Sequence, residues 1–344
     1  MSNQAPWSTV LSLGITVPET MPSPEAMEFA VSLEAAGFDM AWLTEIEREA
    51  FTRAATILAR TTNLRVGTGV VVWSRSPVNA AMASAELDEL SGGRFVFGVG
   101  VGTAYMSEAF HNIAWERPAS RMAEYVKVIR GAWNAHDDQT ALTFEGEYHR
   151  VSGYSQSCYR SAPKLVLAAV QKGMLRLAAR AADGVMFNPA TTLDYCQDYA
   201  LPTLESAAEA SGRRLEDVER YVAMRCAVNE DGDLARHWAR LGICEYGQYP
   251  VHQRVYELNG FPGEAAAIAA AMSEGDLDRA AAAVPDAMVE MFSVSGTPDE
   301  ARAQLRKWEG LVHGVSLSAP GLVPTEELRE NCRAIRDAFS RGQA

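Results

Sequence analysis

Apolar residues along the chain gather in short runs, and each run is followed by a longer segment with helical spacing of its apolar positions. The runs are apolar on both faces of the expected strand, which is typical of buried parallel strands. They lie at residues 10–17, 38–43, 64–72, 94–100, 164–170, 183–188, 220–228 and 313–319. Eight alternating strand and helix units predict one α/β domain over residues 1–344, a (β/α)8 TIM barrel with insertions.

Capping residues mark the ends of several predicted helices. Ser23-Pro24 and Ser76-Pro77 each place an N-cap serine before a proline at the first helical position. The segment Thr297–Glu300 has the spacing of a capping box. Gly92 follows a helical segment and supplies the left-handed residue that ends such a helix.

Two segments interrupt the alternation. Residues 142–151 alternate polar and apolar positions around Glu145-Gly146, which predicts a small hairpin. Residues 230–290 are rich in alanine and helical in pattern, and they separate the seventh strand from the eighth. We expect this second insertion to be either a lid over a substrate or an element that serves only packing or dimerisation.

Charge and composition exclude several classes of partner. The chain carries 31 basic and 44 acidic residues, a net charge of −13, and it has no dense cluster of Lys and Arg. Binding to nucleic acid or to an anionic membrane is therefore not expected. The first 17 residues contain no basic residue, and no apolar run reaches the length of a membrane span. We expect a cytoplasmic protein.

Cysteines and histidines do not suggest a metal site. The five cysteines, at 158, 196, 226, 244 and 332, form an odd set without a C-x-x-C pair, which favours reduced thiols. The six histidines, at 111, 136, 149, 237, 252 and 313, show no H-E-x-x-H spacing. We therefore predict no bound metal.

The glycine-rich stretch at residues 98–102 has an unusual composition for a strand. Gly98 and Gly100 fit the start of a G-x-G-x-x-G dinucleotide turn, but the third glycine position is occupied by Thr103. The stretch instead falls at the carboxyl end of the fourth barrel strand, the side on which TIM barrels place their active sites. We interpret Gly100 and Gly102 as positions where the absence of a side chain leaves room for a flat ligand across the barrel mouth.

Five segments in register resemble the luciferase-like family of barrel oxidoreductases, and within it the branch that uses coenzyme F420, a deazaflavin. They are RVGTGVVVWSRSP, LDELSGGRFVFGVGVG, RPASRMAEYVKVIRGAW, FEGEYHRV and LAAVQKGMLRLAARAADGVMFN. The resemblance implies a luciferase-like barrel, a small organic substrate and a homodimer.

The turn after the fifth strand has the features of a phosphate site. A helix begins near Gly173, so the free N–H groups of its first turn point out of the barrel. In the resembling proteins this turn holds the phosphate of the cofactor. The resemblance thus implies cofactor contacts from Ala168, Ala169, Gln171, Lys172, Gly173 and Met174.

The resemblance also implies how the ring of the cofactor is supported. Family members carry a bulge with a non-proline cis peptide in the third strand, which here corresponds to Gly69-Val70. Together with Gly100, Gly102 and Thr103, these residues are expected to lie under or beside the ring.

Glu45, at the end of the second strand, is the first candidate for a catalytic acid. A carboxyl group there can be partly buried, which would raise its pKa and suit it to donate a proton. Many F420 enzymes have Asp-His at this place, and this chain has Glu45-Ile46. The chain fits better a subgroup of the family in which Thr-Glu, here Thr44-Glu45, is followed by an acidic residue and a phenylalanine. In this chain these residues are Glu49 and Phe51.

The remaining candidates line the predicted substrate pocket. They are Trp42, Trp73, Arg75 and His111, all placed near the carboxyl ends of strands by the barrel prediction. With them the leading hypothesis is an F420-dependent hydride-transferring oxidoreductase. An FMN-dependent monooxygenase of the same fold, in which reduced flavin reacts with oxygen, and a barrel that binds a flavin-like ligand without turnover stay open as alternatives.

Overall fold

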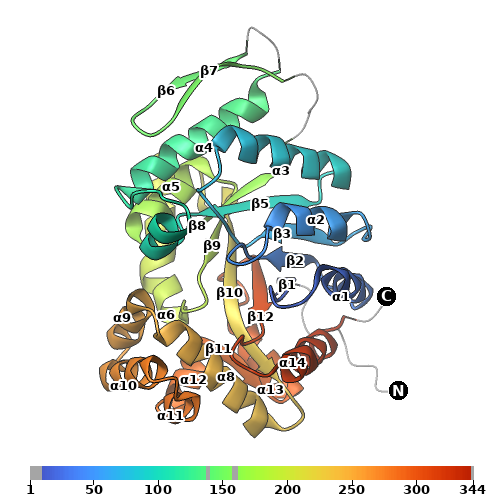
Figure 1. Cartoon of the computed structure of the whole chain (residues 1–344), viewed down its shortest axis with the longest axis vertical. Coiled ribbons are helices and arrows are strands. Elements are labelled where there is room, and N and C mark those ends of the chain that lie inside the picture. Colours follow the sequence, from blue (N-terminus) through green and yellow to red (C-terminus); the bar gives the residue numbers. More distant parts are fainter. Residues whose placement is uncertain (1–9, 137–139, 157–161, 342–344) are drawn as a thin grey trace.

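The structure, a computed structural model, describes residues 10–136, 140–156 and 162–341. Its centre is a closed barrel of parallel strands, which confirms the predicted TIM-like fold (Figure 1). The barrel strands are β1 (Ser12–Thr16), β2 (Met40–Leu43), β3 (Arg65–Thr68), β5 (Phe95–Gly100), β8 (Lys164–Ala168), β9 (Gly184–Phe187), β10 (Glu219–Val228) and β12 (Gly314–Ser318). Neighbours pair in this order, and the barrel closes where β12 pairs with β1.

Helices surround the barrel and connect its strands (Figure 1). The first part of the chain forms α1 (Ser23–Ala35), α2 (Ala50–Leu58), α3 (Pro77–Ser91), α4 (Pro118–Asn134), α5 (Lys172–Ala181), α6 (Leu193–Tyr195) and α7 (Leu201–Glu209). After the long segment between β10 and β12, α14 (Thr325–Ala338) follows the last strand. No helix in the described ranges is both long and apolar enough to cross a membrane.

The predicted capping signals are confirmed in part. Thr297 and Glu300 form the capping box of α13 (Pro298–Arg306), and Gly92 ends α3 with a φ of 64°. Ser23 is different, because α1 begins at this residue and Pro22 precedes it as the N-cap. Ser76 is the N-cap of α3, but its side chain makes no capping hydrogen bond.

The third strand of the pattern is interrupted. β3 ends at Thr68, and the chain resumes as the two-residue β4 (Val71–Val72), which pairs with β5. Between them the peptide bond of Gly69-Val70 is cis, at the position that the family resemblance implied. The segment stays bonded to both neighbours, because the N–H of Gly69 donates to the carbonyl oxygen of Leu43 at 2.7 Å and β4 pairs with β5.

One strand was not predicted. β11 (Ser293–Gly296) pairs in parallel with the carboxyl-terminal half of β10, outside the closed barrel. β10 spans residues 219–228, and its first half pairs with β9 and β12. The sequence SVSG carries no continuous apolar run, so the pattern of apolar positions does not reveal this strand.

The segment between β10 and β11 is helical, as the pattern predicts. It consists of α8 (Gly232–Gly247), α9 (Pro250–Leu258), α10 (Pro262–Ser273), α11 (Leu277–Ala282) and α12 (Asp286–Phe292). In the segment of the expected hairpin, β6 (Leu142–Glu145) and β7 (Arg150–Tyr154) form an antiparallel pair. In Figure 1 this pair and helices α9 to α12 lie at opposite ends of the long axis.

A buried cluster that includes Met40, Trp42, Met186 and Tyr221 fills the interior of the barrel. Trp42 is 1% exposed, and its ring packs edge-on against Tyr221 at 5.3 Å between ring centroids. A Cβ atom at Gly14 would lie 2.8 Å from the indole nitrogen, and one at Gly67 would lie 2.5 Å from the indole ring. Glycine on the two flanking strands thus leaves the volume that the indole occupies.

Candidate active site

The carboxyl ends of three strands carry small residues that approach one another closely. A Cβ atom at Gly100 would lie 2.8 Å from Val70 and 2.9 Å from Ala168. Gly69 and Val70 are half-buried, whereas Ala169 is buried beneath them at 2% exposure. The predicted ring-supporting residues of β3, β5 and β8 are therefore brought together. We call Gly69, Val70, Gly100 and Ala168 the small-residue wall.

The loop after β5 continues from this wall. Gly102 has a φ of 67°, and a Cβ atom there would lie 2.9 Å from Val72, so the conformation and the space both favour glycine. The Thr103 hydroxyl accepts a hydrogen bond from the N–H of Met106 at 3.1 Å. Thr103 therefore holds the turn into the π-helical segment Met106–Phe110.

The first turn of α5 matches the predicted phosphate site. Gln171 is the N-cap, its side chain makes no capping bond, and the first intrahelical bond runs from Leu175 to Gln171. The N–H groups of residues 172–174 precede that bond and are free to bind an anion. Lys172 and Gly173 are exposed, while the Met174 side chain is 7% exposed and points into the core. Only the backbone of Met174 is available to a ligand.

Arg121, which the sequence analysis did not single out, lies on α4, whose first turn contacts the first turn of α5. A Cβ atom at Gly173 would touch Ala119, so the first turns of α4 and α5 are in contact. The Arg121 guanidinium lies 5.2 Å from the Trp73 ring centroid and 5.8 Å from that of Tyr148. No carboxylate within the described ranges forms an ion pair with it. A flat, half-buried guanidinium between two aromatic rings is well prepared to bind a phosphate.

Glu45 belongs to a cluster of charges just after the end of β2. Its carboxylate accepts a hydrogen bond from Arg75 at 2.9 Å and one from the N–H of Ala50 at 3.1 Å. Arg75 also bonds Glu49 at 2.6 Å and lies over the Phe51 ring. Burial opposes the charge on Arg75, but its hydrogen bond and proximity to Glu45 raise its pKa. The side chain of Glu45 is 15% exposed, and its role as a proton donor stays a prediction.

Three residues predicted to line the substrate pocket lie elsewhere or at its edge. Trp42 fills the barrel interior below the mouth, because the glycines beside it leave room for its indole. Trp73 is 2% exposed, donates a hydrogen bond to Ser107 at 3.1 Å and packs edge-on against Trp115. His111 is exposed in the loop after β5, next to Phe110. Of the four predicted pocket residues, Arg75 contacts the candidate acid directly.

A second arginine at the mouth was also missed. Arg225 on β10 is 7% exposed and forms an ion pair with Glu245 at 3.0 Å. Its guanidinium lies 4.4 Å from the Tyr246 ring centroid, so the end of α8 covers it. Arg225 is the one charged residue in the stretch from Tyr221 to Val228, and this was the signal in the sequence. The contact fastens the helical insertion to the barrel.

Acid should weaken the packing of α9 on the end of α8, where His252 lies against Tyr246. Burial, with the charge of Arg225, lowers the pKa of His252 to about 4. Since His252 then binds its proton more weakly in the folded state, its contribution to stability is complete above about pH 6.5 and is lost as pH falls to 4. We expect the free energy of unfolding to fall by about 2 kcal/mol more in the wild type than in His252→Gln between pH 7 and pH 4.5.

Urea unfolding at the two pH values measures this difference. His252 faces the Tyr246 ring at 4.5 Å, Tyr249 at 6.4 Å and the charge of Arg225. His237→Gln, on α8, is the matched control and should leave the wild-type pH dependence unchanged. Equal pH dependence in the wild type and His252→Gln would contradict the assignment.

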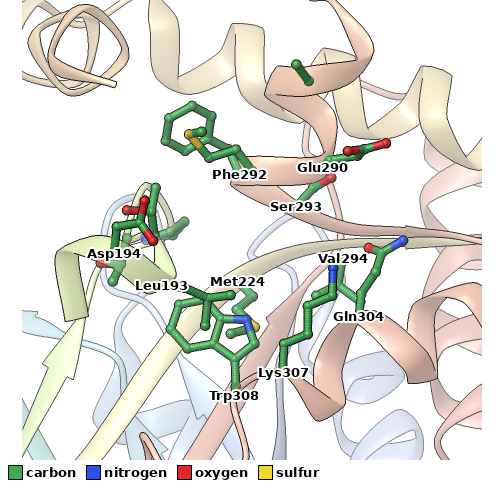
Figure 2. Close-up of a pocket in the computed structure, with 15 residues that line it drawn as sticks. Leu193, Asp194, Met224, Glu290, Phe292, Ser293, Val294, Gln304, Lys307 and Trp308 are labelled. Atoms are coloured by element: carbon green, nitrogen blue, oxygen red, sulfur yellow. The ribbon is translucent and has the colours of Figure 1, made fainter. Parts of the chain in front are cut away.

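A cavity of about 390 Å³ lies on the outer side of the barrel wall, away from the predicted cofactor residues. It is formed by the loop after β9, by Met224 of β10, and by α12, β11 and the end of α13. Figure 2 shows Lys307 and Trp308 at the end of α13 facing Phe292 across it. Neither Glu45 nor the first turn of α5 lines this cavity.

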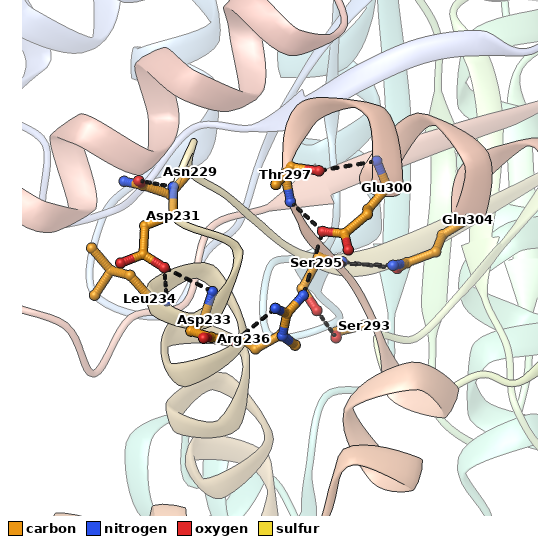
Figure 3. A network of polar contacts seen from close by, with 10 residues as sticks. All are labelled: Asn229, Asp231, Asp233, Leu234, Arg236, Ser293, Ser295, Thr297, Glu300 and Gln304. Carbon is orange, nitrogen blue, oxygen red and sulfur yellow. Dashed lines mark hydrogen bonds and ion pairs between the residues drawn. The ribbon is translucent and has the colours of Figure 1, made fainter.

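Polar contacts join α8 to α13, and α13 to β11 (Figure 3). Arg236 of α8 bonds Asp233 at 2.7 Å and Glu300 of α13 at 3.4 Å. Gln304 bonds both the N–H and the carbonyl oxygen of Ser295, at 2.9 and 2.7 Å. The helical insertion is therefore attached to the barrel at the start of α8 as well as at its end.

No group of metal ligands is found among the described residues. The described cysteines, Cys196, Cys226, Cys244 and Cys332, are buried free thiols. Burial raises the pKa of Cys196 and of Cys332 to about 12, so these thiols are protonated and unreactive at neutral pH. Cys158 lies outside the described residues.

Comparison with known proteins shows the family to which the chain belongs. Residues 8–313 match the family described as luciferase-like monooxygenase. A 5,10-methylenetetrahydromethanopterin reductase of Archaeoglobus fulgidus is 29% identical over 285 residues, which cover 80% of this chain and 83% of that protein.

Two solved structures have the same fold. The coenzyme F420 dependent tetrahydromethanopterin reductase from Methanopyrus kandleri is similar with a TM-score of 0.80 and 22% identity, over 95% of this chain and 98% of that chain. The monooxygenase RslO1 from Streptomyces bottropensis is similar with a TM-score of 0.68 and 25% identity, over 96% and 98%. Since the family match spans well over half of its length, the protein belongs to the luciferase-like monooxygenase family.

Proposed function

We propose that this protein is an F420-dependent oxidoreductase that moves a hydride between the bound deazaflavin and a small organic substrate. The observation that carries the proposal is the small-residue wall, in which a side chain at Gly100 would have no room between Val70 and Ala168. A wall of this kind lets a flat ring lie directly on the backbone. The similarity to a methylenetetrahydromethanopterin reductase supports a reductase, and the F420-dependent structure of the same fold supports the cofactor.

The residues at the mouth fit the separate parts of such a cofactor. The N–H groups of residues 172–174, together with Arg121, would hold its phosphate. The small-residue wall would support the ring. The deazaflavin also carries a long acidic tail. Lys172 is exposed, lies 5.5 Å from the Tyr199 ring centroid, and stands at the rim where that tail would pass.

When bound, the deazaflavin supplies or accepts the hydride, and the protein orients the reactants in a site that excludes water. Arg75 fixes the position of the Glu45 carboxyl group through their hydrogen bond. Glu45 is our candidate for moving a proton to or from the substrate. The end of α8 covers the opposite side of the mouth through Tyr246 and Glu245.

An anaerobic titration of the purified protein tests the cofactor. We expect oxidised F420 to bind at least about tenfold more tightly than FMN, a difference of about 1.4 kcal/mol, because Lys172 lies at the rim where the acidic tail of F420, which FMN lacks, would pass. The change in cofactor fluorescence measures both affinities.

The same titration separates the alternatives. Tighter binding of reduced FMN, with oxygen uptake when air is admitted, would overturn the proposal in favour of a monooxygenase. Tight F420 binding with unchanged absorbance across a broad panel of substrates would instead indicate a ligand-binding barrel.

A further inference from the structure

The barrel mouth has two unlike halves. At the carboxyl ends of β5 and β8, and directly after β3, the inward positions are the small residues Gly100, Ala168 and Gly69. On the opposite strands β1, β10 and β12 the inward positions are polar. The glycines show which residues of β1 and β12 face inward, because a Cβ atom at Gly14 would meet Trp42 inside the barrel and one at Gly314 would meet Tyr221. Alternate residues on a strand share a face, so the polar set faces inward as well; it comprises Thr16, Arg225, Ser316 and Ser318.

Arg225 is the strongest hydrogen-bond donor of this polar half. One terminal nitrogen bonds Glu245 at 3.0 Å, and the other lies 3.4 Å from the Ser318 hydroxyl. Its Nε is buried and has no partner in the described part of the chain. A buried guanidinium N–H without an acceptor is costly, and such groups are normally satisfied by a protein group, water or a ligand. Glu245 and the Tyr246 ring hold the guanidinium in place.

The charges around Arg225 disfavour an anionic occupant. Glu245 already balances its charge, and Glu245 also accepts a hydrogen bond from the N–H of Gly321 at 3.2 Å. At the opposite rim, Arg75 is shared between the two carboxylates Glu45 and Glu49. A second carboxylate at Arg225 would add negative charge to a mouth that has no excess of positive charge on this side. A neutral carbonyl oxygen would accept the N–H without that cost.

We propose that Arg225 determines substrate specificity by donating a hydrogen bond to the carbonyl oxygen of a neutral ketone or enone. This inference rests on the proposed function. In the reduction of a ketone, the carbonyl carbon gains the hydride, the π electron pair of C=O moves to oxygen, and that oxygen takes up one proton from Glu45 or from solvent water. The substrate is reduced by two electrons to an alcohol, and the reduced deazaflavin is oxidised by two electrons. Arg225 stabilises the negative charge that develops on the oxygen.

Binding to the cofactor-free protein tests the proposal directly. The probes are cyclohexanone and 2-cyclohexen-1-one, with cyclohexanecarboxylate as the anionic analogue, observed by saturation-transfer NMR. The wild type should bind the two ketones more tightly than the carboxylate, and Arg225→Met should weaken ketone binding at least about tenfold. Because truncation of Arg225 leaves Glu245 unpaired, the double variant Arg225→Met with Glu245→Gln provides a second test in which neither charge remains.

A matched control and a kinetic readout complete the design. Arg236→Met removes an arginine from α8 outside the mouth and should leave probe binding unchanged. With reduced F420, the double variant should lose at least about tenfold in kcat/KM for 2-cyclohexen-1-one, while its affinity for F420 changes less than about twofold.

Three results would overturn the proposal: no ketone binding by the wild type, ketone binding unchanged in both Arg225 variants, or preference for the carboxylate. These results do not depend on the cofactor. Failure of F420 to bind would refute the proposed function, and the NMR measurement on the cofactor-free protein would still decide the role of Arg225.

Discussion

Gly98→Ala should prevent the barrel from folding normally, with a loss of about 3 kcal/mol or more in the free energy of unfolding. A Cβ atom at Gly98 would overlap the carbonyl oxygen of Thr68 on the neighbouring strand. The Thr68 hydroxyl donates to the Gly98 carbonyl oxygen at 2.6 Å and accepts from the Gly98 N–H at 2.8 Å. The obstacle is backbone and cannot rotate away, so β3 and β5 would have to separate. Urea unfolding followed by circular dichroism, with the yield of folded protein, measures the loss.

Gly263→Ala is the matched control for this substitution. Gly263 lies in the first turn of α10, and no atom is within 4 Å of the position of its Cβ atom. Alanine is the better helix former, so this change should be neutral or slightly stabilising. An unfolding midpoint for Gly98→Ala equal to that of Gly263→Ala would show that the close approach of β3 and β5 is not required.

Arg121→Met should weaken F420 binding about 100-fold, equivalent to about 2.7 kcal/mol. Arg121 is held against the Trp73 and Tyr148 rings on α4, the helix whose first turn contacts that of α5, so its charge-assisted hydrogen bonds to a phosphate would form with little loss of side-chain entropy. Methionine keeps much of the packing volume and removes the charge. Fluorescence titration at two salt concentrations measures the affinity, and the variant should also show weaker salt dependence.

Arg130→Met tests whether any arginine on α4 has this effect. Arg130 lies near the other end of the same helix, where it bonds Asp183 at 2.9 Å. Its substitution should change F420 affinity less than about threefold. Unchanged F420 binding in Arg121→Met, together with intact folding, would place the phosphate away from the contact between α4 and α5.

The barrel could be predicted from the sequence because its strands are buried on both faces. Such strands read as continuous apolar runs, and each of the eight runs overlaps a strand of the barrel. β11 did not follow this rule, since two of its four residues are serines that bond other protein groups. The interruption between β3 and β4 was anticipated only through the family resemblance.

Backbone features of the site were easier to predict than side-chain roles. The glycines of β5 and the start of α5 follow from local sequence, because helix starts and close backbone approaches need particular residues. The position of Trp42 depends instead on which residues flank it on β1 and β3. Arg121 and Arg225 became candidates only when the structure placed Trp73 and Tyr246 against them. Contacts between segments distant in the chain decide these roles.

The pairing of β1 with β12 constrains how a chain of this kind reaches its native state. Ser12 faces Gly314 in that pairing, and Arg329 of α14 bonds Glu25 of α1 at 2.6 Å. During synthesis, one edge of β1 therefore has no partner until nearly the whole chain has left the ribosome, and the helices between β10 and β12 emerge before the barrel can close. An unpaired strand edge can recruit other chains. Closure of the barrel therefore waits for β12, and a chain that lacks this strand leaves the edge of β1 open to pairing with other chains.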